Sequence, residues 1–389
     1  MWYFVCPEVV FGEDALSRLA ELPGKSAFIV TDKNMVKLGL VDRVKEQLAQ
    51  AEIVTDHVFD EVEPDPSLET VRKGSAMMRR SEPDWVVAVG GGSVMDAAKA
   101  MRVEYVRPDM PAEEINPFSL GLDLGSRCKL VCVSTTSGTG AEATWAIVLT
   151  DTQTETKLGL GSRDVLADIA IVDPALAASM PPQVTADTGM DVLTHGVEGF
   201  TSTFKNDISD GLCIRAIQLV FQYLPRAVAN GDDMEAREKM HNAACIAGLG
   251  FGNSMAALAH SLGHALGTVF HIPHGRAVGL FLPYAIEFIG EGREELWAEI
   301  AYAIKQEVPD GSKAVPVLNR ALRGLAGSIK QPLSIAEAGV PADQFDRAMS
   351  KLIDNAVADS QLVSTLRVPG EAETEKLFRY AYEGKSIDF

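Results

Sequence analysis

The sequence predicts an N-terminal α/β domain with a parallel, Rossmann-like sheet over residues 1–180, followed by an all-α domain over residues 181–389. A chain of 389 residues is long enough for two or three domains. Apolar runs in the first half end in turn residues and are followed by helical spacing, as is typical of buried parallel strands. Beyond residues 181–182, which are both proline, almost every segment has a helical period.

The strands are predicted at residues 26–31, 85–89 and 129–133, and an amphipathic helix ends near residue 50. In the second domain, helices are predicted at residues 210–228, 234–249, 294–305 and 342–358. Residues 240–275 contain no Asp, Glu, Lys or Arg, which is also a property of membrane spans. Because this stretch contains histidines, asparagines and a proline, it is predicted to be helix buried in protein.

Composition excludes several classes of partner. The formal net charge of −19 repels phosphate backbones, so no nucleic-acid partner is expected. The five cysteines are scattered without CxxC spacing, which indicates a reducing compartment. The first residues lack a basic segment followed by a long apolar run, so the sequence predicts no export, no membrane anchor and a cytoplasmic location.

Two glycine-rich loops are candidates for phosphate binding. Gly90-Gly91-Gly92-Ser93 lies between a predicted strand and a predicted helix, where glycines allow close approach and helix amides bind anions. Ser93 and Asp96 have capping-box spacing, so a tight turn with a capped helix is the alternative. Residues 134–144, with six hydroxyl side chains, follow the next strand, and an ordinary surface loop is the alternative there.

Asp32 follows the first predicted strand. A carboxylate at this point accepts hydrogen bonds from a ribose diol and repels a 2′-phosphate, which favours NAD over NADP. Asp is also common as a helix N-cap, and the sequence leaves both roles open.

Histidines form the sharpest pattern. Residues 260, 264, 271 and 274 are all histidine in a region almost free of charge. His260 and His264 share a helix face, and Pro273 is expected to leave His274 in a turn that folds back toward them. Asp191 and His195 also have i, i+4 spacing. One carboxylate and three imidazoles are plausible ligands of divalent iron or zinc; a salt-bridged Asp–His pair with unrelated core histidines is the alternative.

These residues together resemble the iron-containing (group III) alcohol dehydrogenases. The matching elements occur in family order along the whole chain: residues 7–12, 31–33, 90–99, 135–144, 191–202 and 260–283. The resemblance implies a dehydroquinate synthase-like architecture, a homodimer or larger homo-oligomer, and hydride transfer between NAD(H) and a small alcohol or aldehyde at a metal in the interdomain cleft.

The resemblance also implies roles for particular residues. The implied ligands of the metal, which is Fe²⁺ or alternatively Zn²⁺, are Asp191, His195, His260 and His274. His264 is implied to assist proton transfer. The implied contacts of NAD, with NADP as the less favoured cofactor, are Asp32, Asp65, Gly91, Gly92, Ser93, Thr135, Thr136, Thr139 and Lys157.

The chain departs from the family pattern at Asp65, where Asn is frequent, at Gly196 and Gly199, where Ala is usual, and at Arg276. Arg276 raises the alternative of an anionic group on the substrate. Two rival functions remain. One is a non-redox or polyol-phosphate-specific relative, which is disfavoured because residues 240–275 lack basic side chains. The other is a non-catalytic metal- or nucleotide-binding protein, which is disfavoured because the ligand set is complete and His264 is present.

Overall fold

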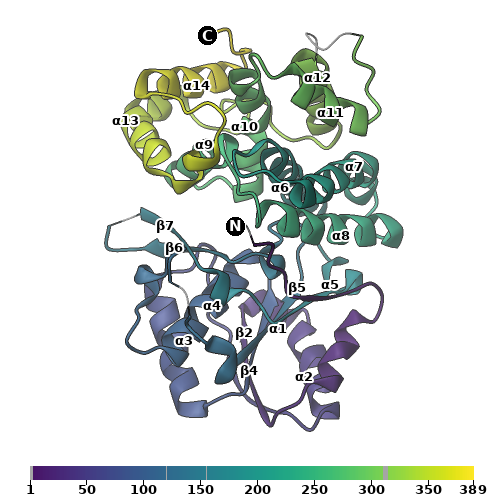
Figure 1. The fold of residues 1–389 in the computed structure, drawn as a ribbon, viewed down its shortest axis with the longest axis vertical. Coiled ribbons are helices and arrows are strands. Elements are labelled where there is room, and N and C mark those ends of the chain that lie inside the picture. The colour runs from purple at the N-terminus through teal and green to yellow at the C-terminus, as the bar shows by residue number, and fades with distance from the viewer. Residues whose placement is uncertain (1–2, 120, 155, 310–313) are drawn as a thin grey trace. The chain divides into compact units, whose positions relative to one another are not determined.

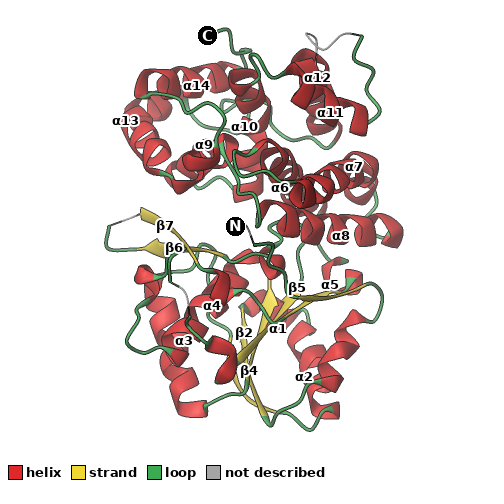
Figure 2. Ribbon diagram, viewed as in Figure 1, coloured by secondary structure: helices red, strands yellow, loops and turns green. Residues whose placement is uncertain are grey.

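The computed structural model describes residues 3–119, 121–154, 156–309 and 314–389. The chain forms two compact units, Met1–Ser179 and Met180–Phe389 (Figure 1). Every strand belongs to the first unit, and the described part of the second unit is built from helices and loops (Figure 2). The predicted fold class, a Rossmann-like sheet domain followed by a helical domain, is confirmed.

The first unit contains a sheet of six parallel strands in the order β1-β8-β5-β4-β2-β3. Their bounds are β1 (Glu8–Phe11), β2 (Ser26–Thr31), β3 (Val54–Phe59), β4 (Trp85–Gly90), β5 (Lys129–Ser134) and β8 (Ile169–Val172). A separate antiparallel pair consists of β6 (Ala146–Asp151) and β7 (Thr156–Gly161). The helices of this unit are α1 (Lys33–Lys37), α2 (Leu40–Gln50), α3 (Leu68–Ser81), α4 (Gly92–Val106) and α5 (Pro174–Ala177).

The central strands are apolar along their whole length because both faces of the sheet are covered. Phe28 and Val30 of β2 belong to one hydrophobic cluster, whereas Ala27 and Ile29 belong to another. Successive side chains of a strand point to opposite faces, so each face has its own core.

Loops that follow neighbouring strands meet at the carboxyl edge of this sheet. After β2 the chain continues to β3 on one side, and β4 pairs with β2 on the other side, so the strand order reverses between β2 and β4. Thr31 pairs in register with Val89, and Gly90 pairs with Ser134. The loops after β2, β4 and β5 therefore lie side by side at a topological switch point, where α/β sheets bind ligands.

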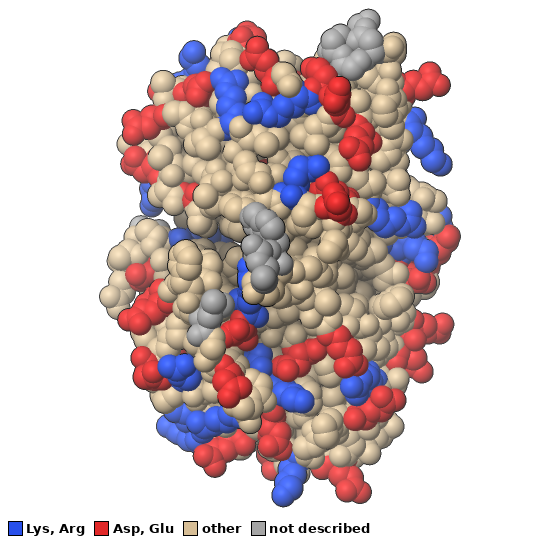
Figure 3. All heavy atoms as spheres, viewed as in Figure 1, with Lys and Arg blue, Asp and Glu red and all other residues tan. Residues whose placement is uncertain are grey.

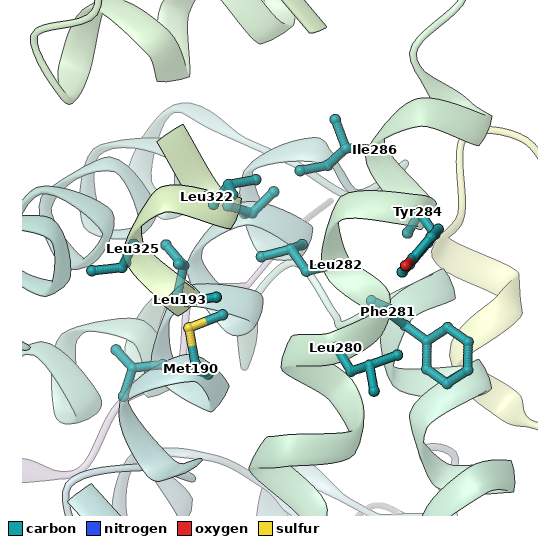
Figure 4. Packing of buried hydrophobic residues seen from close by; sticks show 14 of the residues in the cluster. Met190, Leu193, Leu280, Phe281, Leu282, Tyr284, Ile286, Leu322 and Leu325 are labelled. Carbon is teal, nitrogen blue, oxygen red and sulfur yellow. The ribbon is translucent and has the colours of Figure 1, made fainter. Parts of the chain in front are cut away.

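The helices of the second unit are α6 (Pro182–Thr201), α7 (Asp207–Ala229), α8 (Met234–Phe251), α9 (Leu258–Phe270), α10 (His274–Ile289), α11 (Glu294–Ala303), α12 (Ala314–Ser328), α13 (Ala342–Ala358) and α14 (Glu371–Glu383). They share one hydrophobic cluster. Figure 4 shows Met190 and Leu193 of α6 beside Leu322 and Leu325 of α12 and Leu282 of α10. This packing fixes α6 and α10, which position the site described below.

The apolar stretch at residues 240–275 forms the end of α8, all of α9 and the start of α10. Among the described residues, no helix has the length and apolarity needed to cross a membrane. On the face seen in Figure 3, acidic and basic side chains are interspersed.

Candidate metal centre and cofactor-binding edge

Asp191, His195, His260 and His274 come together in the helical unit. One potential ligand atom from each lies within 4.8 Å of the others. Asp191 Oδ1 is 3.8 Å from His195 Nδ1, 3.7 Å from His260 Nε2 and 3.4 Å from His274 Nε2. The geometry therefore collects one carboxylate and three imidazoles at a single point.

The ligand atoms of three of these side chains are buried and unsatisfied. Asp191 Oδ1, His195 Nδ1 and His260 Nε2 have no hydrogen-bond partner in the part of the chain that the structure describes. A buried polar atom without a partner costs about 1–3 kcal/mol, so three such atoms around one point require a compensating charge. One oxygen and three nitrogens are a donor set that suits divalent iron or zinc, and the residues present thus fit a metal ion.

Local helix geometry accounts for these positions. Asp191 and His195 are one turn apart on α6, so their side chains project from the same face. His260 lies in the first turn of α9. A Cβ atom at Gly275 would lie 2.2 Å from the backbone oxygen of Asp187, which shows how closely the start of α10 approaches α6. Only glycine permits this approach.

The predicted turn at His274 is wrong in detail. His274 is the first residue of α10, and Pro273 is its N-cap with an extended ψ of 135°. The reversal of the chain occurs earlier, at His271, whose φ of 55° is left-handed. Pro273 therefore starts a helix, because its fixed φ suits a helix N-terminus. His271 is outside the metal-ligand group.

Glu198 supports the cluster, and sequence reasoning missed its role. His260 Nδ1 donates to Glu198 Oε2 at 2.5 Å. The same carboxylate accepts the backbone amides of Ala257 at 2.9 Å and Ala259 at 2.5 Å. With Nδ1 occupied in this way, Nε2 of His260 faces the other ligands. The available signal was the i, i+7 spacing of Asp191 and Glu198, which places both on one face of α6.

Burial and neighbouring charge shift the pKa values of the cluster. Burial lowers the pKa of His195 to about 3. Burial also disfavours charge on His260, but Glu198 and Asp191 outweigh it and raise its pKa to about 10. Burial opposes ionisation of Asp191 as well, yet the adjacent imidazoles hold its pKa well below the usual range. The carboxylate is thus in the ionised form that binds cations.

His264 lies beside this cluster, one turn after His260. Its ring centroid is 5.2 Å from that of His274. Its Nδ1 lies 2.7 Å from Asp359 Oδ2, a second partner that sequence reasoning missed. Burial lowers the pKa of His264, and the Asp359 carboxylate partly opposes that effect. Asp359 lies just after α13, far from His264 in sequence, so no local spacing indicates this pair.

Arg276 is already paired within the protein. Its Nε donates to Oδ1 of Asp187 on α6, and its Nη2 donates to Oδ2 of the same residue, each at 3.0 Å. The guanidinium that suggested an anionic substrate group is therefore held in a bidentate ion pair.

In the sheet unit, the two glycine-rich loops are in contact. A Cβ atom at Gly91 would lie 3.1 Å from Thr136 Oγ1, and one at Gly92 would lie 2.8 Å from Thr139 Cγ2. Thr135 Oγ1 is buried without a hydrogen-bond partner among the described residues. The glycines thus allow the two loops to approach each other closely, and this edge of the sheet contains an unsatisfied hydroxyl.

The capping box that was the alternative interpretation of Ser93 and Asp96 does not form. The N-cap of α4 is Gly91, so the helix begins earlier than the motif assumed. Ser93 Oγ instead accepts the backbone amide of Asp65 at 3.3 Å, and Asp96 Oδ2 accepts the amide of Val148 at 2.9 Å. Glycine at the cap leaves the first amides of α4 uncapped by a side chain.

Asp65 and Lys157 form an ion pair next to Ser93. Lys157 Nζ lies 2.8 Å from Asp65 Oδ1. Asp65 has a left-handed φ of 54°, and its backbone oxygen accepts a hydrogen bond from Thr150. The carboxylate of Asp65, at a position where the family often has Asn, therefore offsets the positive charge of Lys157.

Asp32 is the N-cap of α1. Its Oδ1 accepts the backbone amides of Asn34 at 2.7 Å and Met35 at 3.2 Å. The residue lies directly after β2, beside the loop that follows β4. Asp32 therefore caps α1, which is one of the two roles that the sequence left open. Its other carboxylate oxygen, Oδ2, does not take part in the cap.

Comparison with known proteins decides the family. A family model described as iron-containing alcohol dehydrogenase matches residues 6–174, and the model of the C-terminal part of the Fe-containing alcohol dehydrogenase family matches residues 185–382. The chain belongs to the iron-containing alcohol dehydrogenase family. As an iron-containing alcohol dehydrogenase it is an oxidoreductase that acts on CH–OH groups, and the rival functions are not favoured. Members of the family use NAD(P) and iron or another divalent metal.

Three individual relatives are similar along nearly the whole chain. The NADPH-dependent butanol dehydrogenase of Clostridium saccharobutylicum is 37% identical, with 100% of both chains covered. The structure of an alcohol dehydrogenase from Oenococcus oeni has a TM-score of 0.93 at 30% identity and covers 98% of this chain and 100% of its own. The sulfoacetaldehyde reductase of Bifidobacterium kashiwanohense, solved with NAD⁺, has a TM-score of 0.84 at 28% identity, with 98% of each chain covered.

Proposed function

We propose that Asp191, His195, His260 and His274 hold a divalent metal, Fe²⁺ in the first place and Zn²⁺ alternatively, at which a small alcohol or aldehyde reacts with NAD(H). The observation that carries this proposal is the group of buried, unpartnered ligand atoms that converge on one point. When bound, the metal supplies Lewis acidity that polarises a carbonyl group, and the nicotinamide supplies or accepts the hydride.

His264 exchanges the proton that accompanies hydride transfer. Asp359 accepts the Nδ1 proton at 2.7 Å, which leaves Nε2 as the basic nitrogen. Burial lowers the pKa of His264, so the imidazole is neutral and able to accept a proton at physiological pH.

NAD is the proposed cofactor, bound at the carboxyl edge of the sheet. The contacting loops at Gly91–Ser93 and Thr135–Thr139 support a pyrophosphate position near the start of α4. The Asp32 carboxylate supports NAD over NADP because it disfavours a 2′-phosphate. Asp65 and Lys157, linked by their ion pair, are proposed as further cofactor contacts.

The remaining proposals concern the assembly and its location. A homodimer or larger homo-oligomer is proposed from the family resemblance, and light scattering coupled to size exclusion measures the mass; a monomer would contradict it. A cytoplasmic location is proposed because all five cysteines are free, which suits a reducing compartment. Cell fractionation with immunodetection tests this location.

The deciding experiment measures NADH oxidation with a panel of short aldehydes. Protein stripped by a chelator is compared with the same protein reloaded anaerobically with Fe²⁺ or Zn²⁺. We expect activity to be lost on stripping and to return with one of the two metals, which identifies the working metal and ranks the substrates.

Two variants connect that activity to the proposed ligands. Asp191→Asn and His274→Ala are expected to lose both bound metal and activity, because each removes one ligand of four. A matched control, His57→Ala, changes an exposed histidine of the sheet unit and is expected to retain both. Inactivity of the reloaded wild-type protein with both NADH and NADPH would reject the proposed reaction.

A further inference from the structure

Asp187 lies one turn before the proposed ligand Asp191 and is the acceptor of an extensive hydrogen-bond group. Besides the two bonds from Arg276, its Oδ1 accepts Gln183 Nε2 at 3.1 Å and Gln331 Nε2 at 2.8 Å. The Asp187 side chain is only 9% exposed. Every donor converges on one carboxylate, and these hydrogen bonds hold it in place.

The pair joins the two helices that meet at the metal centre. Asp187 is on α6, whereas Arg276 is in the first turn of α10, two residues after His274. Between them, the missing side chain of Gly275 lets the backbones touch. A bidentate ion pair fixes direction as well as distance, so it holds the first turn of α10 against α6.

Among the proposed ligands, His274 is the one that most depends on helix placement. Its side chain is 34% exposed, whereas those of Asp191, His195 and His260 are 2%, 5% and 4% exposed. The ring of His260 is oriented by Glu198, and the ring of His195 stacks on Phe251 at 3.9 Å. For His274, the described contacts are the 3.4 Å approach of its Nε2 to Asp191 Oδ1 and ring contacts with His260 and His264, and none of them holds its ring from outside the cluster.

We propose that the Asp187–Arg276 ion pair is a positioning clamp that holds His274 in place as a ligand and thereby sets the affinity of the centre for its metal. This inference rests on the proposed function of the four ligands. Neither Asp187 nor Arg276 belongs to the ligand group, so the clamp acts only through the position of α10. It also gives Arg276 a role other than binding a substrate anion.

The test measures the affinity for Co²⁺, which substitutes for Fe²⁺ or Zn²⁺ and is visible by its absorption. Metal-free wild-type protein and the variants Arg276→Gln, Asp187→Asn and Arg276→Lys are titrated in competition with a coloured chelator. We expect the dissociation constant to rise about ten-fold or more in the Gln and Asn variants, since partners that orient ligands typically contribute about 10–100-fold to metal affinity. Arg276→Lys should lie between these variants and the wild type, because lysine cannot form the bidentate pair.

Two further proteins separate a local effect from a general one. Arg226→Gln breaks a comparable bidentate pair with Asp233, which is remote from the ligands in sequence, and should leave the dissociation constant within about two-fold of the wild type. The double variant Asp187→Asn/Arg276→Gln should bind Co²⁺ no more weakly than the weaker-binding single variant, because both changes remove the same interaction. Circular dichroism of the metal-free proteins checks folding, and Arg276→Lys carries the test if Arg276→Gln does not fold.

The outcomes distinguish the clamp from the centre itself. If His274→Ala weakens Co²⁺ binding but Arg276→Gln and Asp187→Asn bind like the wild type or like Arg226→Gln, the clamp is overturned and the centre stands. If His274→Ala also leaves the affinity unchanged, His274 is not a ligand, and both proposals are overturned.

Discussion

His260 Nδ1 lies 2.5 Å from Glu198 Oε2, at the same carboxylate that accepts two backbone amides from the beginning of α9. One side chain of α6 thus fixes both the orientation of an imidazole and the end of the helix that carries it. An imidazole held in this way offers a defined nitrogen to a metal and is more basic than a free one.

Replacing this carboxylate tests its effect on the metal. Glu198→Gln is expected to weaken metal binding about 10–100-fold, because a neutral amide orients His260 less strongly and leaves its imidazole less basic. Chelator competition measures the dissociation constant. Glu104→Gln is the control: Glu104 is another buried glutamate that accepts a hydroxyl and a backbone amide, but it lies in the sheet unit. Equal effects of the two variants would contradict a specific role for Glu198.

If His264 exchanges the proton, replacing it should slow turnover without weakening metal binding. His264→Ala should lower kcat about 10²–10⁴-fold, as is typical for loss of a general acid or base, while the metal content stays at the wild-type level. Asp359→Asn should lower kcat less, because the imidazole and an acceptor oxygen remain and only the charge of the partner at Nδ1 is lost. Steady-state kinetics and metal analysis of the same samples give both quantities. An unchanged kcat for His264→Ala would remove the assignment without affecting the ligands.

Asp32 combines a structural and a selective role, and two substitutions separate them. Asp32→Asn retains an oxygen that caps α1 and removes the charge, so kcat/KM with NADPH should rise relative to NADH while stability is kept. Asp32→Ala should show the same change in preference and also lose about 1 kcal/mol of unfolding free energy. Kinetics with both cofactors and urea unfolding measure the two effects. A preference that both variants leave unchanged would show that Asp32 does not select the cofactor.

Two buried thiols of the sheet unit predict sensitivity to alkaline pH. Burial raises the pKa of Cys128 and of Cys132 to about 12. Because an unfolded thiol ionises near pH 8.5, the folded state binds more protons between about pH 8.5 and 12, and the unfolding free energy falls as pH rises through this range. Each thiol contributes a slope of up to about 1.4 kcal/mol per pH unit. Below pH 8.5 its contribution is fully present.

Urea unfolding at several pH values, followed by tryptophan fluorescence, measures that slope. Cys132→Ala should have a shallower decline above pH 9 than the wild type, although it is less stable below pH 8.5 because it loses buried volume. Cys6→Ala, which changes an exposed cysteine, should keep the wild-type slope. Identical slopes in all three proteins would show that Cys132 does not contribute.

Local patterns predicted what depends on neighbours in sequence. Apolar runs such as residues 85–89 identify strands because both faces are buried, and the i, i+4 spacing of Asp191 and His195 predicts that the two side chains lie together because one helix turn separates them. The partner Asp359 could not be predicted in this way, since its approach to His264 depends on tertiary packing. The turn expected at His274 was wrong because Pro273 caps a helix, and the alternative of a capping box at Ser93 does not hold because Gly91 takes the cap.

The proposed ligand atoms come from three helices, α6, α9 and α10. A metal ion bound to all of them is therefore a cross-link, and it stabilises only the folded form, so its free energy of binding adds to that of folding. Without it, the helical unit retains buried ligand atoms that have no hydrogen-bond partner among the described residues. In a cell short of metal, the chain would then open more often and be degraded sooner by proteases. Supply of the ion would govern how much of this protein persists as well as how fast it works.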